Sequence, residues 1–299
     1  MKWFFLALFL VPTLYVQLRG RVRYNVFRQI GDHSTLFAPL NAFMYLFSRV
    51  PLTPYLPVES LPELRVLREN WKTIRDEALQ LRAGNSIKAS AQYDDAGFNS
   101  FFRFGWKRFH LKWYADAHPS AQKLCPQTVR MLQQIPSIKA AMFAELPSGG
   151  RLMRHRDPYA GSLRYHLGLV TPNDDGCWID VDGQRYSWRD GEDVVFDETY
   201  IHQAKNETDV DRIILFCDVE RPMRFRWAQA VNRWFATHLV QAAASPNDDG
   251  DRTGGINRAF KYFYAVRLQG KKLKAYSKPL YYTVKWAIFL AIVALIVWI

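Results

Sequence analysis

Cysteine is scarce in this sequence, and the way it occurs argues against two kinds of fold. The 299 residues include only Cys125, Cys177 and Cys217, an odd number with no Cys-x-x-Cys spacing. A disulfide framework needs paired cysteines, and a zinc knuckle needs closely spaced ligands. Neither is expected here, and a reducing compartment is the simpler interpretation. The sequence also contains no internal repeat.

Acidic residues are outnumbered by basic ones. Lys and Arg total 40 against 28 Asp and Glu, so the formal charge is +12. This charge favours an anionic partner: nucleic acid, an anionic membrane or a phosphorylated substrate. Residues 98–114 combine bases with aromatic residues but carry no known RNA-binding signature, so we expect a core strand pair rather than a nucleic-acid platform. The ten tryptophans and the aromatic content of 15% suit a protein at a lipid interface.

Both ends of the chain are hydrophobic. Residues 1–18 are almost entirely apolar but short for a membrane span, which needs about 17–25 residues. Residues 281–299 contain one charge, Lys285, and we expect a transmembrane helix there. The N-terminal segment either crosses the bilayer or lies on it as an interfacial helix. No small-x-small cleavage site follows it. A basic cluster follows instead: Arg19, Arg21, Arg23 and Arg28. By the positive-inside rule, the domain between the two ends faces the cytoplasm.

Four residues in the second half of the chain have the pattern of a metal centre. His155 and Asp157 are two residues apart, so on an extended segment their side chains point to the same face. His202 comes from a distant strand. Two histidines and one carboxylate form the facial triad of non-haem Fe(II) oxygenases, which leaves coordination positions open. Arg212 can meet the far carboxylate of an iron-bound 2-oxo acid. A surface His-x-Asp pair and a structural His202 remain the alternatives at this point.

The tripeptide His155-Arg156-Asp157 also imitates the catalytic loop of protein kinases. That loop requires Asn five residues after its Asp, where this chain has Ser162. No Asp-Phe-Gly motif follows in the sequence. The kinase interpretation is therefore excluded.

From residue 138 onward the sequence has the pattern of short strands. Leu163–Val170 alternates, so that Arg164 and His166 share one face while apolar residues share the other. Cys177–Trp188 is typical of a hairpin around the turn dipeptide Asp182-Gly183. Strands with turns every 8–12 residues or so indicate a sandwich or barrel.

We therefore expect a mainly β fold, a double-stranded β-helix (jelly-roll or cupin) core with flanking helices and hydrophobic terminal membrane segments. A helix is predicted over 59–82 and a polar linker over 241–255. The expected divisions are a membrane segment over 1–18, a basic juxtamembrane region and helix over 19–90, the β-helix dioxygenase domain over 91–222, a basic helical or linker region over 223–280, and a transmembrane helix over 281–299.

Three stretches of the sequence resemble one family. They are His155–Val170, Val195–His202 and Arg212–Val219, the second continued by Asn206-Glu-Thr. All three are similar to the core of the aspartyl/asparaginyl β-hydroxylases. Within that family the chain is most similar to the bacterial members that 2-hydroxylate acyl chains of lipid A. The resemblance covers about residues 140–222 and is looser outside them.

The resemblance implies a double-stranded β-helix that uses Fe(II), 2-oxoglutarate and O2 as cofactor and co-substrates. It implies His155, Asp157 and His202 as metal ligands and Arg212 as the partner of the 2-oxoglutarate 5-carboxylate, with Arg164 and His166 assisting. The alternatives are an ordinary salt bridge for Arg164 and a core position for His166. Animal members of the family have glycine at the position of Asp157, so the aspartate here predicts a complete triad.

The motifs do not identify the substrate. Two hydrophobic ends flanked by bases favour a lipid, because lysine and arginine attract phosphorylated head groups and anionic lipid. The leading hypothesis is 2-hydroxylation of a fatty acyl chain of lipid A, or of another acylated phospholipid or glycolipid, at the cytoplasmic face of a bacterial inner membrane. The alternatives are a membrane-anchored hydroxylase of protein substrates and a non-enzymatic cupin-like scaffold. Arg103, Lys107 and Arg151 are candidates for contact with the lipid.

Overall fold

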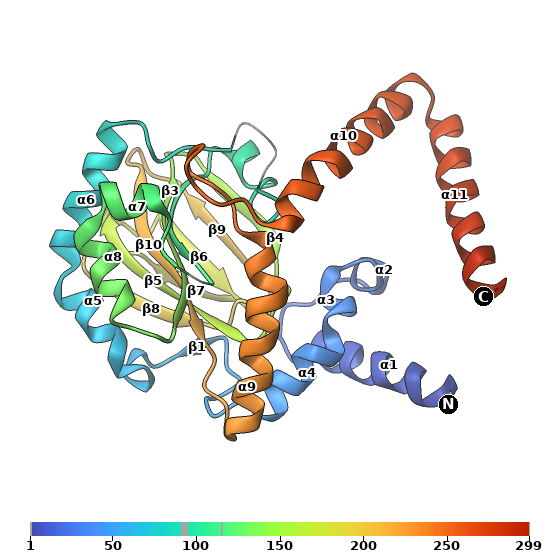
Figure 1. The fold of residues 1–299 in the computed structure, drawn as a ribbon, viewed down its shortest axis with the longest axis horizontal. Helices are drawn as coiled ribbons and strands as arrows, with labels where there is room; N and C mark the ends of the chain where they lie inside the picture. The colour runs from blue at the N-terminus through green and yellow to red at the C-terminus, as the bar shows by residue number, and fades with distance from the viewer. Residues whose placement is uncertain (1, 91–94, 115, 299) are drawn as a thin grey trace.

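Two antiparallel β-sheets face each other and form the centre of the molecule. The computed structural model describes residues 2–90, 95–114 and 116–298 (Figure 1). The larger sheet has the strand order β1-β8-β5-β10-β3-β2, and the smaller sheet has the order β4-β9-β6-β7. Facing antiparallel sheets of this kind are the jelly-roll or cupin architecture, as predicted. The strands are β1 Tyr55–Leu56, β2 Lys107–Trp113, β3 Ile138–Leu146, β4 Arg151–His155, β5 Ser162–Val170, β6 Cys177–Val181, β7 Gln184–Ser187, β8 Asp193–Phe196, β9 His202–Asn206 and β10 Arg212–Glu220.

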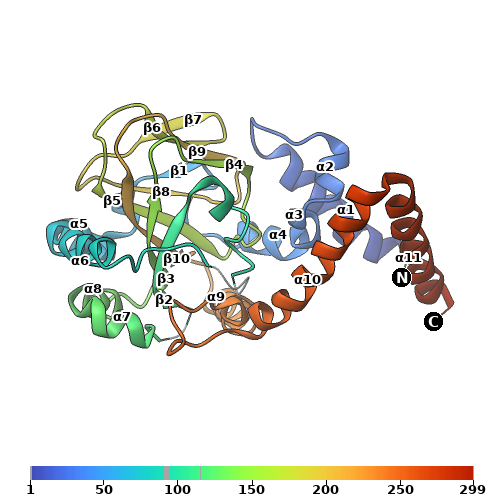
Figure 2. The same ribbon diagram turned by 90° about the horizontal axis from the view of Figure 1, so that it is seen from above.

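Helices cover the outer face of the larger sheet and extend from the core at both ends of the chain. In both views α5–α8 lie on one side of the sheets, while α1–α4, α10 and α11 lie on the other (Figures 1 and 2). The helices are α1 Lys2–Leu18, α2 Val26–Ile30, α3 His33–Leu36, α4 Ala38–Leu46, α5 Arg65–Glu69, α6 Trp71–Ala83, α7 Pro119–Leu124, α8 Pro126–Gln133, α9 Arg226–Phe235, α10 Gly255–Tyr276 and α11 Lys278–Trp298.

The alternation predicted in β5 determines which side chains reach the interior between the sheets. Leu163, Tyr165 and Leu167 pack in one buried cluster with the apolar residues of α5–α8. Arg164 and His166 point the other way, into the space between the sheets, because successive side chains of a strand alternate. The neighbouring strand β10 pairs antiparallel with β5, in a register that places Phe216 opposite His166 and Asp218 opposite Arg164. Both strands therefore present polar groups to one interior space.

The hairpin expected around Asp182-Gly183 is present between β6 and β7. Both turn residues have positive φ, +55° for Asp182 and +83° for Gly183, as a two-residue hairpin turn with primed geometry requires. The Asp182 carboxylate also accepts hydrogen bonds from the backbone N–H groups of Arg21 and Val22. This turn therefore connects the N-terminal segment to the smaller sheet.

Three local predictions differ from the structure. The helix predicted over 59–82 is interrupted at Asn70, whose side-chain amide donates to the Val66 carbonyl and caps α5. Residues 98–114 form one strand, not two, because a 3-10 turn over Phe102–Phe104 and the left-handed Gly105 (φ 84°) precede β2. The linker predicted over 241–255 packs on the core. Within it, the Asn247 side chain bonds to both the N–H and the carbonyl of His110.

Helices form over both hydrophobic ends, but the predicted membrane spans are not found. No helix in the described part of the chain is long and apolar enough to cross a membrane. At the N-terminus, α1 has 17 residues and contains Pro12, and its Val16 is buried against residues of α4. At the C-terminus, the span predicted over 281–299 includes side chains that lie outside the described residues.

Arg19, grouped by its position in the sequence with Arg21, Arg23 and Arg28 in a basic cluster, is buried in an ion pair. Its guanidinium lies 2.7 Å from the Asp197 carboxylate, and Arg221 lies 3.0 Å from the same group. All three side chains are buried. Arg19 also lies between the rings of Tyr45 and Tyr200, 4.1 and 3.9 Å from their centroids. This ion cluster fixes the end of α1 to the loop that precedes His202.

Asp197→Ala is expected to lower the free energy of unfolding by roughly 3–5 kcal/mol, because two buried guanidinium groups lose their shared counter-charge. The matched control is Asp175→Ala, since the Asp175 carboxylate pairs with Arg189 while 88% exposed. An exposed pair contributes about 0–1 kcal/mol. Denaturant unfolding of both variants measures the difference. Equal, small losses would show that the cluster does not anchor α1.

Candidate metal centre and co-substrate pocket

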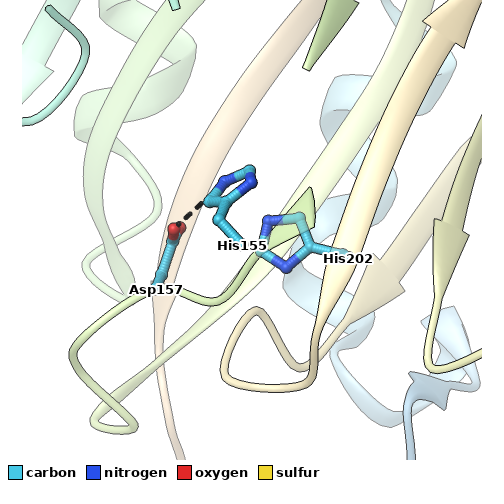
Figure 3. Close-up of side chains that lie close together, drawn as sticks. All are labelled: His155, Asp157 and His202. Carbon is cyan, nitrogen blue, oxygen red and sulfur yellow. Dashed lines mark ion pairs between the residues drawn. The ribbon is translucent and has the colours of Figure 1, made fainter. Parts of the chain in front are cut away.

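The three predicted metal ligands converge at the edge of the smaller sheet. His155 ends β4 and lies directly opposite His202, the first residue of β9, in the antiparallel register. The ligand atoms of His155, Asp157 and His202 all lie within 4.8 Å of one another, and the His155 Nε2 atom is 3.5 Å from an Asp157 oxygen. The side chains point toward one another (Figure 3). The spacing suits a single ion held by two nitrogens and one oxygen.

The loop after β4 brings Asp157 to this centre. The sequence had placed His155 and Asp157 on one extended segment, but β4 ends at His155 and Asp157 lies in the loop that follows. The Asp157 N–H donates to the Glu198 carbonyl at 2.9 Å, which fixes the loop beside the segment leading to β9. A long-range backbone hydrogen bond therefore does the positioning that strand alternation was expected to do.

Backbone carbonyls orient both histidine rings. The His155 Nδ1 atom lies 2.7 Å from the Met153 carbonyl oxygen, and the His202 Nδ1 atom lies 2.9 Å from that of Tyr200. A carbonyl only accepts, so each Nδ1 carries the proton and each Nε2 presents its lone pair to the centre. Burial lowers the pKa of His155, and burial together with His155 lowers the pKa of His202 to about 3. Both rings are therefore neutral at physiological pH, the form that binds metal.

The third ligand is ionised. Burial by itself would raise the pKa of the Asp157 carboxyl, but the attraction of the Arg164 guanidinium holds it below its ordinary value. Two neutral imidazoles and one carboxylate are the donor set of the non-haem Fe(II) facial triad. The residues therefore fit Fe(II).

Arg164 is already surrounded by carboxylates. Its guanidinium lies 2.8 Å from Asp157 and 3.0 Å from Asp218, and it also contacts Glu198. It stacks on the Phe216 ring, 3.8 Å from the centroid. The geometry thus corresponds to the salt-bridge alternative for Arg164, with one difference: one of its partners is a metal ligand. Arg164 fixes the orientation of Asp157 as a positioning residue.

Arg212 has the opposite environment. It is 2% exposed, and no carboxylate in the described part of the chain lies within ion-pair distance of it. Its guanidinium lies over the Trp188 ring, 4.2 Å from the centroid, and its Nε atom has no hydrogen-bond partner. Burial lowers the pKa of Arg212 to about 10. A buried cation without a counter-charge is costly, so this position suits an anionic ligand.

Two further buried groups beside Arg212 lack partners. Both ring nitrogens of His166 and the Nε1 atom of Trp188 have no hydrogen-bond partner. Burial, with the nearby Arg164 and Arg212, lowers the pKa of His166 well below its usual value, so the ring is neutral. The three side chains line one cavity with the metal ligands. Together they offer hydrogen-bond donors and one charge to a carboxylate, as the distal end of 2-oxoglutarate requires.

The other end of this cavity is aromatic and apolar. Phe101 lies 4.8 Å from His155 between ring centroids, and Phe98 stacks on Trp106 at 4.9 Å. Sequence reasoning assigned these residues to a core strand pair and missed Trp188 altogether. The only available signal for Trp188 was its place at the end of the predicted hairpin. The side chains at the apolar end of the cavity are Phe98, Phe101, Trp106 and Leu152.

The bases proposed for contact with lipid have different surroundings. Lys107 donates to Glu145 at 2.6 Å, so its charge is already paired. Arg103 is exposed and donates to the Tyr264 hydroxyl at 3.3 Å. Arg151 is exposed over the Phe104 ring. Arg103 and Arg151 are therefore exposed cations, and Arg151 precedes Leu152, which lines the cavity.

The fold and the site together indicate which class of enzyme this protein belongs to. A jelly-roll core with a His-Asp-His centre next to a buried, unpaired arginine is the arrangement of Fe(II)- and 2-oxoglutarate-dependent oxygenases. Residues 68–222 match the model of the Aspartyl/Asparaginyl beta-hydroxylase family. The chain belongs to this family, whose enzymes are hydroxylases that use Fe(II) and 2-oxoglutarate. The non-enzymatic scaffold is therefore set aside.

Individual relatives differ in their substrates. The chain is 40% identical over 120 residues to the ornithine lipid ester-linked acyl 2-hydroxylase of Rhizobium tropici, covering 40% of this chain and 43% of the relative. It is 27% identical over 164 residues to human aspartyl/asparaginyl beta-hydroxylase, covering 53% of this chain and 21% of the relative. The chain thus spans less than half the length of either. A Pseudomonas putida prolyl-4-hydroxylase structure aligns with a TM-score of 0.35 at 16% identity, over 62% of this chain and 99% of that one.

Proposed function

We propose that this enzyme hydroxylates C2 of a fatty acyl chain on lipid A, at the cytoplasmic face of a bacterial inner membrane. The observation that carries the proposal is the apolar, aromatic end of the cavity beside the metal ligands. An Asp or Asn side chain entering there would bring a polar group that needs a partner, and the nearest cation, Arg164, is already engaged by three carboxylates. An acyl chain needs no such partner. The Rhizobium tropici relative, an acyl 2-hydroxylase, supports the same substrate class.

Each group of residues has a distinct task in this proposal. His155, Asp157 and His202 would hold Fe(II), and Arg164 keeps Asp157 in place. Arg212 would bind the distal carboxylate of 2-oxoglutarate. When bound, iron and 2-oxoglutarate supply the activation of O2 that hydroxylation requires. The aromatic side chains at the apolar end would exclude water and align the acyl chain.

Mass spectrometry of lipid A from bacteria that express this chain tests the proposal. We expect an iron-dependent species heavier by about 16 Da, one oxygen atom, that is absent from cells expressing His155→Ala/His202→Ala. Fragmentation is expected to place the oxygen at C2 of an acyl chain. Unchanged lipid A alongside another acyl lipid that has gained the oxygen would reject lipid A but retain the acyl chain as substrate class.

A hydroxylase of protein substrates is the second candidate, favoured by the match to human aspartyl/asparaginyl beta-hydroxylase. It predicts unchanged lipids and a hydroxylated Asp or Asn in a peptide. Succinate release from 2-oxoglutarate by the purified enzyme, with each class of substrate added in turn, separates the two. Stimulation by peptide alone would overturn the lipid proposal.

A further inference from the structure

The excess of basic over acidic residues in this protein lies in three helical segments. Residues 1–49, 223–244 and 255–299 together contain 17 Lys and Arg but a single acidic residue, Asp32. The rest of the chain contains 23 basic and 27 acidic residues, so it is slightly negative. The three segments thus carry a formal charge of +16 and the rest of the chain −4, which together give +12. Such segregation creates one strongly positive region beside a nearly neutral catalytic core.

The three segments lie close together in the fold. In both views α1–α4, α10 and α11 occupy the side of the β core opposite α5–α8 (Figures 1 and 2). One buried cluster contains Val16 of α1, Met44 of α4 and Ala228 of α9, which joins the first two segments. The positive charge is therefore presented on one side of the molecule.

The most exposed apolar side chain on this side, Phe27, belongs to the short helix α2, which exposes two further apolar residues. Phe27 is 90% exposed, and Val26 and Ile30 are each 66% exposed. The buried residue of this helix is Gln29, whose amide donates to Ser34 and Thr35 and so anchors α2 through polar contacts. Adjacent exposed apolar residues of this size mark an interaction site.

Helix α2 is also tied to the segment that carries two metal ligands. The Arg28 guanidinium of α2 donates to the Arg154 carbonyl at 2.9 Å, and in the next helix, α3, the His33 Nε2 atom lies 2.9 Å from the Arg156 carbonyl oxygen. These carbonyls flank His155 in the chain. A surface that engages α2 therefore comes to lie beside the metal centre.

We propose that Val26, Phe27 and Ile30 insert into one leaflet of an anionic phospholipid bilayer, while the surrounding basic segments bind its head groups. The occupant is identified by complementarity: apolar side chains surrounded by cations match the acyl and phosphate layers of such a leaflet. The inference rests on the proposed function, since docking through α2 would place an acyl chain of the same leaflet at the metal centre.

Site-specific fluorescence on the full chain tests the insertion. The three native cysteines are buried, so a single exposed cysteine can be labelled selectively. Phe27→Cys carrying an environment-sensitive dye is expected to shift to the blue with vesicles of phosphatidylcholine and phosphatidylglycerol, and to be quenched by a lipid-borne quencher. The matched control is Leu124→Cys on α7, on the opposite side of the core and 41% exposed.

Each outcome of this fluorescence experiment supports or overturns the insertion of α2 into the bilayer. No shift at position 27 in vesicles that carry the protein overturns the insertion. An equal shift with vesicles of phosphatidylcholine alone overturns the proposal that the basic segments bind anionic head groups. A shift that needs no vesicles and grows with protein concentration assigns α2 to contact with a second copy of the chain, and also overturns the proposal.

Turnover separates a failure of docking from a failure of the proposed function. Phe27→Ser/Ile30→Ser is expected to lose about tenfold or more of its activity on acyl lipid embedded in vesicles, since each buried side chain contributes roughly a tenfold factor to partitioning. Its activity on the same lipid dispersed in detergent is expected to be unchanged. If the unaltered chain turns over neither form, the proposed function fails. Equal loss on both forms overturns the docking role alone.

Discussion

His155→Ala and His202→Ala are each expected to abolish hydroxylation and to lower the affinity for Fe(II) by more than about 100-fold. Loss of a residue that only supports a metal ligand costs up to about 100-fold in affinity, so loss of a ligand itself should cost more. The reason is the geometry: in the described part of the chain, the three ligand atoms within 4.8 Å of one another supply the protein's contribution to the centre. Anaerobic Fe(II) titration and succinate release measure the two effects. Asp157→Gly tests the carboxylate separately and is expected to retain weaker binding through the two histidines.

The control for these substitutions is His238→Ala. His238 is exposed on the segment after α9, where its Nδ1 atom lies 2.8 Å from the Trp234 carbonyl. This change is expected to leave iron affinity and turnover unaltered. Activity that survives both His155→Ala and Asp157→Ala would make the iron assignment untenable.

Arg212→Met is expected to raise the KM for 2-oxoglutarate by about 30-fold or more, because removing one partner of a buried, hydrogen-bonded charge pair costs roughly 2–5 kcal/mol. Iron affinity is expected to be unchanged, since Arg212 is not a ligand. Without 2-oxoglutarate the variant is expected to be at least as stable to unfolding as the parent, because it removes a buried cation with no described carboxylate within ion-pair distance.

This opposite behaviour of stability and co-substrate affinity is what distinguishes a binding residue from a structural one. Arg212→Lys serves as the conservative comparison and is expected to recover part of the affinity, since lysine keeps the charge but not the planar, bidentate geometry. Isothermal titration with 2-oxoglutarate and denaturant unfolding give the two quantities. A variant that unfolds more easily and still binds 2-oxoglutarate with parental affinity would assign Arg212 to the core.

The sequence by itself determined the features that depend on local periodicity and on residue type. The alternation of β5 follows from the two-residue period of a strand, and the Asp182-Gly183 turn follows from the positive φ that these residues tolerate. The types and order of His155, Asp157 and His202 indicated a metal centre but left a surface pair and a structural histidine open, and the family resemblance then favoured the Fe(II) site.

The tertiary structure alone decided which charged groups are paired. Arg164 and Arg212 look alike in the sequence, yet Arg164 contacts three carboxylates, whereas no described carboxylate lies within ion-pair distance of Arg212. The sequence placed Arg19 in a basic cluster and gave no sign of its counter-charge, Asp197, which lies 178 residues away. Trp188 lines the cavity because β10 packs against the β6–β7 hairpin, with Arg212 lying over the Trp188 ring. Such pairings depend on contacts between distant segments, and no local pattern encodes them, because the free energy of a buried charge is set by what the fold brings beside it.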